Sequence, residues 1–414
     1  MKAFPDVNEQ MDAIRADALE VIPEDELFRK LERSVRTGTP LRVKQGFDPT
    51  RPDLHIGHAV SMRKLHVFQE LGHDVIFVVG DYTARIGDPS GRSETRPRLT
   101  PEEIAANAET YAQQVSGILD VSKVRIAYNS SWLAPLDLAK LLELTATYTV
   151  ARMLERDDFA KRYAEQRSIA ISEFMYPLMQ AYDSVALEAD VELGGSDQKF
   201  NLLVGRTVQE RYGQEPQVCL VMPLLRGTDG VAKMSKSYDN YVGIAQAPGE
   251  QFGRTMSIPD SALEEWIRMS GVYAGDAVER AVRDAADNPY RAKRALARGI
   301  AALYHGAEAG EKAEAAFDHL FRDHGTPDDV PEQALPLSDE RLRVQERGGV
   351  WLPGLLVATG LAASNGEAGR LIEQGAVSVD DERASDRNGV IAAQPGDTVM
   401  VRRGKRQFVR VTFT

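Results

Sequence analysis

Glycines and histidines early in the chain could bind the phosphates of a nucleotide. Residues 46–50 read Gly-Phe-Asp-Pro-Thr and residues 55–58 read His-Ile-Gly-His, between an expected strand and the helix after it. In a parallel α/β sheet, nucleotides bind where a strand passes into the next helix. Gly57 lets a ligand approach the backbone, the helix N-terminus presents amide N–H groups, and His55 and His58 can hydrogen-bond phosphate oxygens. Taken alone, the two histidines are explained equally well as surface or helix-cap residues.

A lysine-containing loop after the last expected strand of this region could close over a triphosphate. Residues 233–237 read Lys-Met-Ser-Lys-Ser within the polar stretch 227–240. Two lysines on such a loop can neutralise the charge that builds on a departing pyrophosphate. Taken alone, this pentapeptide is better explained as a charged loop exposed to water.

A third group of polar side chains lies within an apolar helical segment. Tyr176, Gln180 and Asp183 are spaced i, i+4, i+7, so they share one face of a helix. Their neighbours include Met, Leu and Val, and an unpaired polar group in such a setting costs roughly 1 to 3 kcal/mol. This favours a polar ligand at that face. A polar stripe that faces water is the alternative.

Short apolar runs separated by helical patterns must position these groups. We expect strands over 41–47, 74–81, 123–129, 190–195 and 217–222, and helices over 24–36 and 56–72. Alternation of this kind predicts an α/β fold, a doubly wound parallel (Rossmann-like) sheet covered by helices on both faces.

The rest of the chain divides by composition. Residues 251–325 are rich in Ala, Glu and Arg at helical spacing, whereas 325–340 concentrate Pro and Asp without periodicity. From about residue 350 to residue 414 we expect a compact α+β unit with strands over 376–381, 397–403 and 407–413. We therefore predict a catalytic domain over 1–238, a helical domain over 239–330, a linker over 331–348 and a C-terminal domain over 349–414.

Composition narrows the possible classes of protein. The chain has 414 residues, a formal net charge of −12 and one cysteine, Cys219. The charge argues against indiscriminate nucleic-acid binding, and the single cysteine excludes an intrachain disulfide and a multi-cysteine zinc site. We find neither an apolar run of roughly 18 to 20 residues nor the apolar core of a signal peptide, so we expect a cytoplasmic protein with no membrane contact.

Taken together, the motifs resemble those of a known enzyme family. His-Ile-Gly-His followed by Lys-Met-Ser-Lys-Ser matches both signatures of the class I aminoacyl-tRNA synthetases, in the same order and letter for letter. Residues 87–91, 176–183 and 194–198 resemble the substrate-pocket motifs of tyrosyl-tRNA synthetases, and the resemblance covers nearly the whole chain. It implies a tyrosine–tRNA ligase that uses ATP with Mg²⁺ and holds no metal on the protein itself.

The resemblance also implies roles for individual residues. Asp183 would accept a hydrogen bond from the phenolic hydroxyl of tyrosine, Gln198 would lie beside the substrate, and Asp197 would bind the ATP ribose. The ammonium group of tyrosine would be held by Asp88, Tyr176 and Gln180. Residues with catalytic roles would be His55, His58, Lys233 and Lys236. The ATP contacts would be Gly46, Asp48, Thr50, His55, Gly57, His58, Arg92, Arg96, Gly195, Asp197, Lys233, Met234, Ser235, Lys236 and Ser237.

One position departs from the family pattern. Many members carry a tyrosine two residues before the Gly-Phe-Asp-Pro segment, where it also touches the phenolic hydroxyl, and this chain has Lys44 there. The second hydroxyl contact is therefore open. Lys44 could point away while Asp183 works alone, or another residue could replace the tyrosine.

The resemblance extends to partners. Residues 355–384 resemble an S4-type RNA-binding fold, and the helix around 288–306 carries arginines that could meet the anticodon arm of tRNA or could be salt-bridged surface. The apolar segment 138–159, expected as a helix, would form a homodimer interface. Two alternatives remain: a tryptophanyl-tRNA synthetase, and an RNA-binding relative without activity. The expected contacts to tRNA(Tyr) are Asn365, Arg370, Arg402, Arg403, Lys405 and Arg406.

Overall fold

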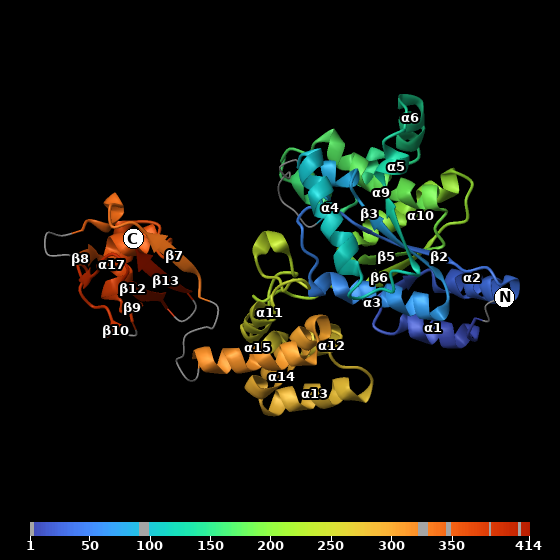
Figure 1. The fold of residues 1–414 in the computed structure, drawn as a ribbon. Coiled ribbons are helices and arrows are strands. Elements are labelled where there is room, and N and C mark those ends of the chain that lie inside the picture. Colours follow the sequence, from blue (N-terminus) through green and yellow to red (C-terminus); the bar gives the residue numbers. More distant parts are fainter. Residues whose placement is uncertain (1–3, 91–98, 322–329, 345–348, 381, 405–406) are drawn as a thin grey trace. The chain divides into compact units, whose positions relative to one another are not determined.

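The chain folds into two compact units, Met1–Glu311 and Lys312–Thr414. The computed structural model describes residues 4–90, 99–321, 330–344, 349–380, 382–404 and 407–414, and Figure 1 shows the fold. Within these residues, no helix has the length and apolarity needed to cross a membrane.

A six-stranded sheet organises the first unit. Its order is β1-β6-β5-β2-β3-β4, and every neighbouring pair is parallel except β1 with β6. The chain runs outward from β2 through β3 to β4, then returns to lay β5 and β6 on the other side of β2. The winding direction therefore reverses between β2 and β5, which is where such sheets bind ligands. The strands are β1 (Glu20–Ile22), β2 (Arg42–Phe47), β3 (Asp74–Val79), β4 (Val124–Tyr128), β5 (Val191–Gly195) and β6 (Val218–Met222).

Helices cover both faces of this sheet. The helices of the first unit are α1 (Val7–Arg15), α2 (Glu24–Thr37), α3 (Ile56–Leu71), α4 (Pro101–Val115), α5 (Ser130–Leu133), α6 (Leu138–Ala146), α7 (Val150–Met153), α8 (Asp157–Ala164), α9 (Ile171–Leu187), α10 (Lys199–Arg211), α11 (Pro248–Met256), α12 (Asp260–Met269), α13 (Asp276–Asp287), α14 (Pro289–His305) and α15 (Ala307–Phe321), the last of which runs past the unit boundary.

Alternating strand residues build a core on each face. On β3, Val75, Phe77 and Val79 join the core that contains the buried residues of α2 and α3. Ile76 and Val78 point the other way, toward Leu187 of α9. This is the two-residue period of a strand buried on both faces.

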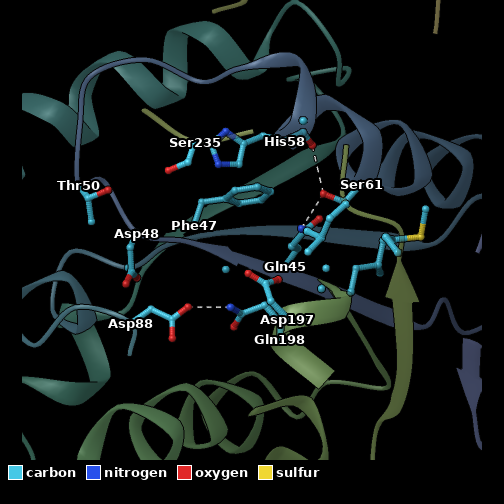
Figure 2. Close-up of a pocket in the computed structure, with 18 of the residues that line it drawn as sticks. Gln45, Phe47, Asp48, Thr50, His58, Ser61, Asp88, Asp197, Gln198 and Ser235 are labelled. Carbon is cyan, nitrogen blue, oxygen red and sulfur yellow. Dashed lines mark hydrogen bonds between the residues drawn. The ribbon is translucent and has the colours of Figure 1, made fainter. Parts of the chain in front are cut away.

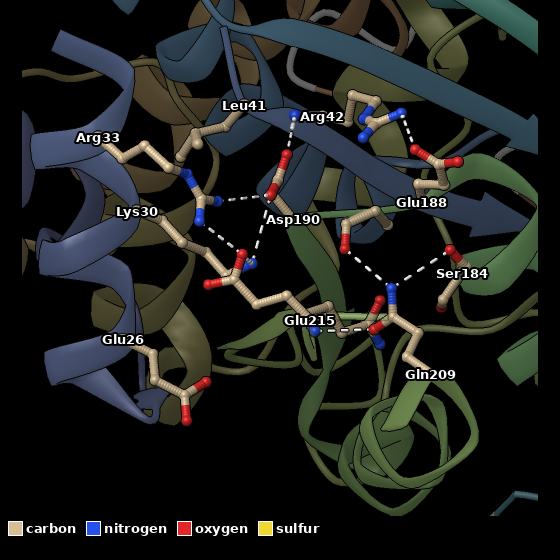
Figure 3. A network of polar contacts seen from close by, with 12 residues as sticks. Glu26, Lys30, Arg33, Leu41, Arg42, Ser184, Glu188, Asp190, Gln209 and Glu215 are labelled. Atoms are coloured by element: carbon tan, nitrogen blue, oxygen red, sulfur yellow. Dashed lines mark hydrogen bonds and ion pairs between the residues drawn. The ribbon is translucent and has the colours of Figure 1, made fainter. Parts of the chain in front are cut away.

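A polar network joins α2 to the start of β5 (Figure 3). The buried ammonium of Lys30 lies 3.3 Å from the Asp190 carboxylate, which also accepts a hydrogen bond of 2.9 Å from the backbone N–H of Arg42. Arg33 reaches both Asp190 and Glu215, at 3.5 and 2.6 Å. These contacts fix α2 against the amino-terminal ends of β2 and β5, the two strands whose carboxyl ends form the pocket described below.

The predicted strands of the first unit are confirmed to within two residues, but one strand was missed and one helix expectation is wrong. β1 was not expected, because three residues carry too little alternation and the strand is defined only by its pairing with β6. The single helix expected over 138–159 is broken after α6 and α7. Thr149 begins α7 by accepting a hydrogen bond from the backbone N–H of Arg152, at 3.3 Å, with its side chain.

The C-terminal unit is a five-stranded sheet packed with two helices. Its sheet order is β10-β9-β12-β13-β7, and β11 pairs with β8 separately. The stretch predicted as a linker contains β7, which pairs in parallel with β13, so the linker prediction is wrong there: Pro and Asp flank a strand that a distant partner stabilises. The elements are β7 (Glu332–Leu335), β8 (Gly349–Trp351), α16 (Leu352–Ala358), α17 (Asn365–Glu373), β9 (Val377–Val379), β10 (Glu382–Arg383), β11 (Val390–Ala392), β12 (Thr398–Arg403) and β13 (Gln407–Phe413).

Candidate active site

A pocket opens where the sheet reverses its winding direction, at the carboxyl ends of β2 and β5. It is lined by the ends of these strands, the start of α3, one face of α9 and the loop after β6. A Cβ atom added to Gly46 would meet no atom within 4 Å, so a side chain there would occupy space that a ligand could fill. His58 and Ser235 lie on one side of the Phe47 ring, and Asp88 and Gln198 lie on the other (Figure 2).

Asp183 lines this pocket with a buried carboxylate. Its carboxylate accepts hydrogen bonds from Trp132 Nε1 at 2.7 Å and Asn129 Nδ2 at 3.3 Å. Burial raises the pKa of Asp183 to about 7, while the positive charge of Lys44 acts in the opposite direction. The group therefore titrates near neutral pH, and its ionised form is a strong acceptor for a hydroxyl donor.

Asp88 and Gln198 form a second polar centre. Gln198 Nε2 donates to the Asp88 carboxylate at 2.7 Å, and Ser90 Oγ donates to it at 2.6 Å. Burial alone would raise the pKa of Asp88, but Arg156 and these hydrogen bonds lower it below its usual value. Asp88 is thus a permanent negative charge beside the pocket, suited to a cationic group.

The α9 side chains complete this end of the pocket. Gln180 Nε2 donates to Glu192 at 3.1 Å, and Gln180 Oε1 accepts from Asn201 Nδ2 at 3.0 Å. Tyr176 donates its hydroxyl hydrogen to the Asp48 carboxylate at 2.9 Å. The helix therefore presents oriented polar groups, as its i, i+4, i+7 spacing predicts.

His55 and His58 stack on each other at the start of α3, with ring centroids 3.7 Å apart. Burial lowers the pKa of His55 to about 3, and that of His58 well below its usual value, so both rings are neutral at pH 7. His58 Nδ1 accepts from the backbone N–H of His55 at 3.3 Å, which assigns the ring hydrogen to Nε2. His58 can therefore donate a hydrogen bond to an anion without carrying a charge.

The loop after β6 brings two lysines to the same pocket. Lys233 pairs with Asp197, and the Lys236 ammonium bonds the hydroxyl of Tyr111 at 3.0 Å and the carbonyl oxygen of Arg51 at 3.2 Å. Asn240 holds the loop by accepting from the backbone N–H of Ser235 at 2.7 Å. Burial lowers the pKa of Lys236 to about 7, with a further lowering by Arg51 and an opposing effect of Asp53. A negatively charged ligand would therefore stabilise the protonated form of Lys236.

The predicted pocket residues that the structure describes all line this one cavity. Arg92 and Arg96 lie outside the described residues. The residues brought together are Gly46, Asp48, Thr50, His55, Gly57, His58, Asp88, Tyr176, Gln180, Asp183, Gly195, Asp197, Gln198, Lys233, Met234, Ser235, Lys236 and Ser237.

Several polar residues of the site were not expected from the sequence. Thr83 donates to Asp48 at 2.7 Å, Asn129 donates to Thr83 at 3.0 Å, and Trp132 bonds Asp183 as described above. Glu192 is buried and accepts from Gln180. A charged residue inside an apolar strand was the available signal for Glu192, since such a group needs a partner.

The predicted RNA contacts lie in the other unit. Asn365 and Arg370 are exposed on α17, whereas Arg403 of β12 bonds the Glu367 carboxylate at 2.9 Å and the Leu361 carbonyl oxygen. Arg403 thus also ties β12 to α17. Arg402 lies over the ring of Phe408, and Lys405 and Arg406 lie outside the described residues.

Comparison with known proteins identifies the class that this fold and pocket define. Residues 36–322 match the family described as tRNA synthetases class I (W and Y), and residues 340–411 match the tyrosine–tRNA ligase SYY-like C-terminal domain. The molecule is a class I tRNA synthetase.

Full-length relatives define the family within that class. A tyrosine–tRNA ligase of Moorella thermoacetica is 50% identical over 413 residues, covering 99% of this chain and 97% of the relative. One of Geobacter sulfurreducens is 50% identical over 410 residues, covering 98% and 99%. The crystal structure of tyrosyl-tRNA synthetase complexed with L-tyrosine from Archaeoglobus fulgidus superposes with a TM-score of 0.61 at 25% identity, covering 75% of this chain and 100% of that one. The chain belongs to the tyrosine–tRNA ligase family.

Proposed function

We propose that the chain activates L-tyrosine with ATP and transfers the tyrosyl group to the 3′-terminal adenosine of tRNA(Tyr). The observation that carries this proposal is the meeting of Asp183 and Lys236 in a single pocket. A buried carboxylate suits a phenol, and a lysine on a loop suits a triphosphate.

The first step requires no general base. A carboxylate oxygen of tyrosine attacks the α-phosphorus of ATP, the bond from that phosphorus to the bridging oxygen breaks, and pyrophosphate leaves. Because the amino acid carboxylate is already ionised, catalysis reduces to positioning and stabilisation of charge. Asp88, Tyr176 and Gln180 hold the ammonium group, and this directs the carboxylate toward the phosphate.

The phosphate end of the pocket supplies donors of two kinds. His55 and His58 act as neutral hydrogen-bond donors to the α-phosphate, whereas Lys233 and Lys236 neutralise the departing pyrophosphate. Lys233 leaves Asp197 when the loop closes, which frees that carboxylate for the ribose hydroxyls. The two histidines at the start of α3 and the two lysines of the loop after β6 thus act on the same phosphate chain from its two ends.

Mg²⁺ enters this scheme on ATP. The pocket carboxylates of Asp48 and Asp88 each already accept from a neighbouring side chain, and Asp197 is proposed to bind the ribose, so the phosphate oxygens are the fitting ligands for the ion. Bound there, Mg²⁺ would reduce the negative charge of the leaving pyrophosphate.

The second step, partner binding and location are also part of the proposal. The terminal ribose hydroxyl of tRNA attacks the tyrosyl carbonyl and releases AMP, while the exposed polar residues of α17 and the arginines of β12 bind the RNA by shape and phosphate contacts.

A homodimer forms through the exposed apolar side chains Leu138, Leu142 and Val150, which are 71%, 61% and 62% exposed in the single chain. We also propose that the enzyme acts in the cytoplasm.

Amino-acid-dependent exchange of labelled pyrophosphate into ATP tests the activity. Exchange with tyrosine, and much less with tryptophan or phenylalanine, is the expected result. Exchange driven by tryptophan would instead identify the sister enzyme, and no exchange with any amino acid would leave an RNA-binding protein. In the same assay, Lys233→Ala and Lys236→Ala should slow activation while equilibrium binding of tyrosine stays unchanged.

A further inference from the structure

A buried ion pair contacts Gln180, one of the residues that line the pocket. Lys44 of β2 and Glu192 of β5 face each other across the parallel strand pair, and their side chains meet at 2.8 Å. Each side chain is 1% exposed. Their neighbours Val43, Val191 and Leu193 point into the core on the opposite face, so the pair faces the α9 side of the sheet.

Glu192 is the centre of a set of four hydrogen bonds. Its Oε1 accepts from Lys44 and from Gln180 Nε2, and its Oε2 accepts from Ser184 Oγ at 3.2 Å and from Gln217 Nε2. Lys44 Nζ also lies 3.5 Å from the carbonyl oxygen of Gln180. The pair therefore touches both the backbone and the side chain of the α9 turn that faces the substrate.

The bond from Gln180 to Glu192 decides which end of the Gln180 amide faces the ligand. A carboxylate can only accept, so it takes the NH₂ group and leaves Oε1 directed away from the strand. Gln180 Oε1 accepts one hydrogen bond from Asn201 and has a second lone pair for a further donor. An ammonium group needs an acceptor of this kind, and an amide turned the other way would repel it.

Lys44 acts on the phenol end of the same pocket by its charge. Burial raises the pKa of Asp183, which lies one turn along α9 from Gln180. The charge of Lys44 lowers this pKa, and the charge of Glu192 raises it by a smaller amount. An ionised Asp183 accepts from the phenolic hydroxyl, whereas a protonated Asp183 would compete as a donor.

We propose that the buried Lys44–Glu192 ion pair is a positioning device for tyrosine: it orients Gln180 toward the substrate ammonium and maintains Asp183 as the acceptor for the phenol. This inference rests on the proposed function of the pocket. Neither residue lines the pocket, and both act through side chains of α9. This role explains why Lys44 can replace the tyrosine that many family members have at this position. Lys44 acts through its charge and its hydrogen bonds, and it makes no second contact to the phenolic hydroxyl.

Two single variants and their double variant separate an effect on the positioning of tyrosine from an effect on the stability of the fold. Lys44→Met and Glu192→Leu each leave one buried charge unpaired, whereas the double variant leaves none and should recover part of the lost thermal stability. The matched control is Arg162→Met with Glu173→Leu, which removes another buried ion pair, joined at 2.6 Å, whose carboxylate is also on α9 but lies outside the pocket.

Pyrophosphate exchange with each variant gives the decisive comparison. We expect the Lys44→Met/Glu192→Leu protein to show a KM for tyrosine raised about tenfold or more, the effect of losing a hydrogen bond to a charged group, with the KM for ATP unchanged. Its preference for tyrosine over phenylalanine should fall as well, and the control should keep both properties. A double variant with the wild-type KM for tyrosine and wild-type preference would overturn the inference. If the wild-type chain itself failed to exchange with tyrosine, the proposed function would fail instead.

Discussion

The low pKa of Lys236 makes ATP binding depend on pH. In the free pocket burial lowers this pKa to about 7, so near neutral pH about half of the molecules carry a neutral amine. A bound triphosphate raises the pKa, since negative charges nearby favour the ammonium form. Above pH 7, binding must then be accompanied by uptake of a proton, and the affinity falls as the pH rises.

The size of the effect follows from that pKa. If Lys236 stays protonated in the complex, the dissociation constant of ATP should rise about tenfold between pH 6 and pH 8 for a free pKa of about 7. Below pH 6 the contribution of Lys236 to the dissociation constant should level off. His55 cannot contribute in this range, because its pKa is lowered to about 3.

Calorimetric titration of ATP with Mg²⁺ at several pH values measures this directly. Lys236→Arg is the matched control: its guanidinium stays charged throughout, and titration of ATP and of Asp183 is the same in both proteins. The ratio of the two dissociation constants should therefore change about tenfold from pH 6 to pH 8. A ratio that does not vary with pH would refute the link between the buried ammonium and the phosphates.

Three further perturbations have expected outcomes. Asp183→Asn should reduce the preference for tyrosine over phenylalanine about 10- to 100-fold in kcat/KM, the effect of a lost hydrogen bond to a charged group, and an unchanged preference would contradict the role of Asp183. Deletion of residues 331–414, which removes β7 together with the sheet that it joins, should abolish tRNA charging and spare pyrophosphate exchange; retained charging would argue against an RNA role for this unit. Lys30→Met should lower the free energy of unfolding in urea by roughly 1.5 to 3 kcal/mol, because the partly buried Asp190 loses its buried cation and keeps only Arg33, at 3.5 Å. A change below about 1 kcal/mol would show that Arg33 alone compensates for Asp190.

Local patterns in the sequence predicted the parts of the molecule that depend on local geometry. The strands of the first sheet are apolar runs long enough to recognise, and Tyr176, Gln180 and Asp183 share a helix face because of their spacing alone. The fold class is confirmed by the sheet topology, and the tyrosine–tRNA ligase family by the relatives of the chain. The roles of individual pocket residues stay predictions.

Features that depend on pairing between distant segments of the chain could not be predicted from local sequence patterns. β1 and β7 exist because each pairs with a strand far along the chain, β6 and β13 respectively. The meaning of Lys44 likewise depends on the register of β2 with β5, which places Glu192 opposite it. A charged residue inside an apolar strand shows that a partner must exist, but only the sheet shows which one.

In the proposed function, one pocket recognises the phenol with Asp183 and the phosphates with His55, His58 and Lys236. The most direct measurement is a crystal structure of the chain with a non-hydrolysable tyrosyl-adenylate analogue. We expect the phenolic oxygen within hydrogen-bond distance of Asp183 and the group that replaces the phosphate within reach of the two histidines. An analogue bound with its phenol turned away from Asp183, or outside the pocket, would contradict the account.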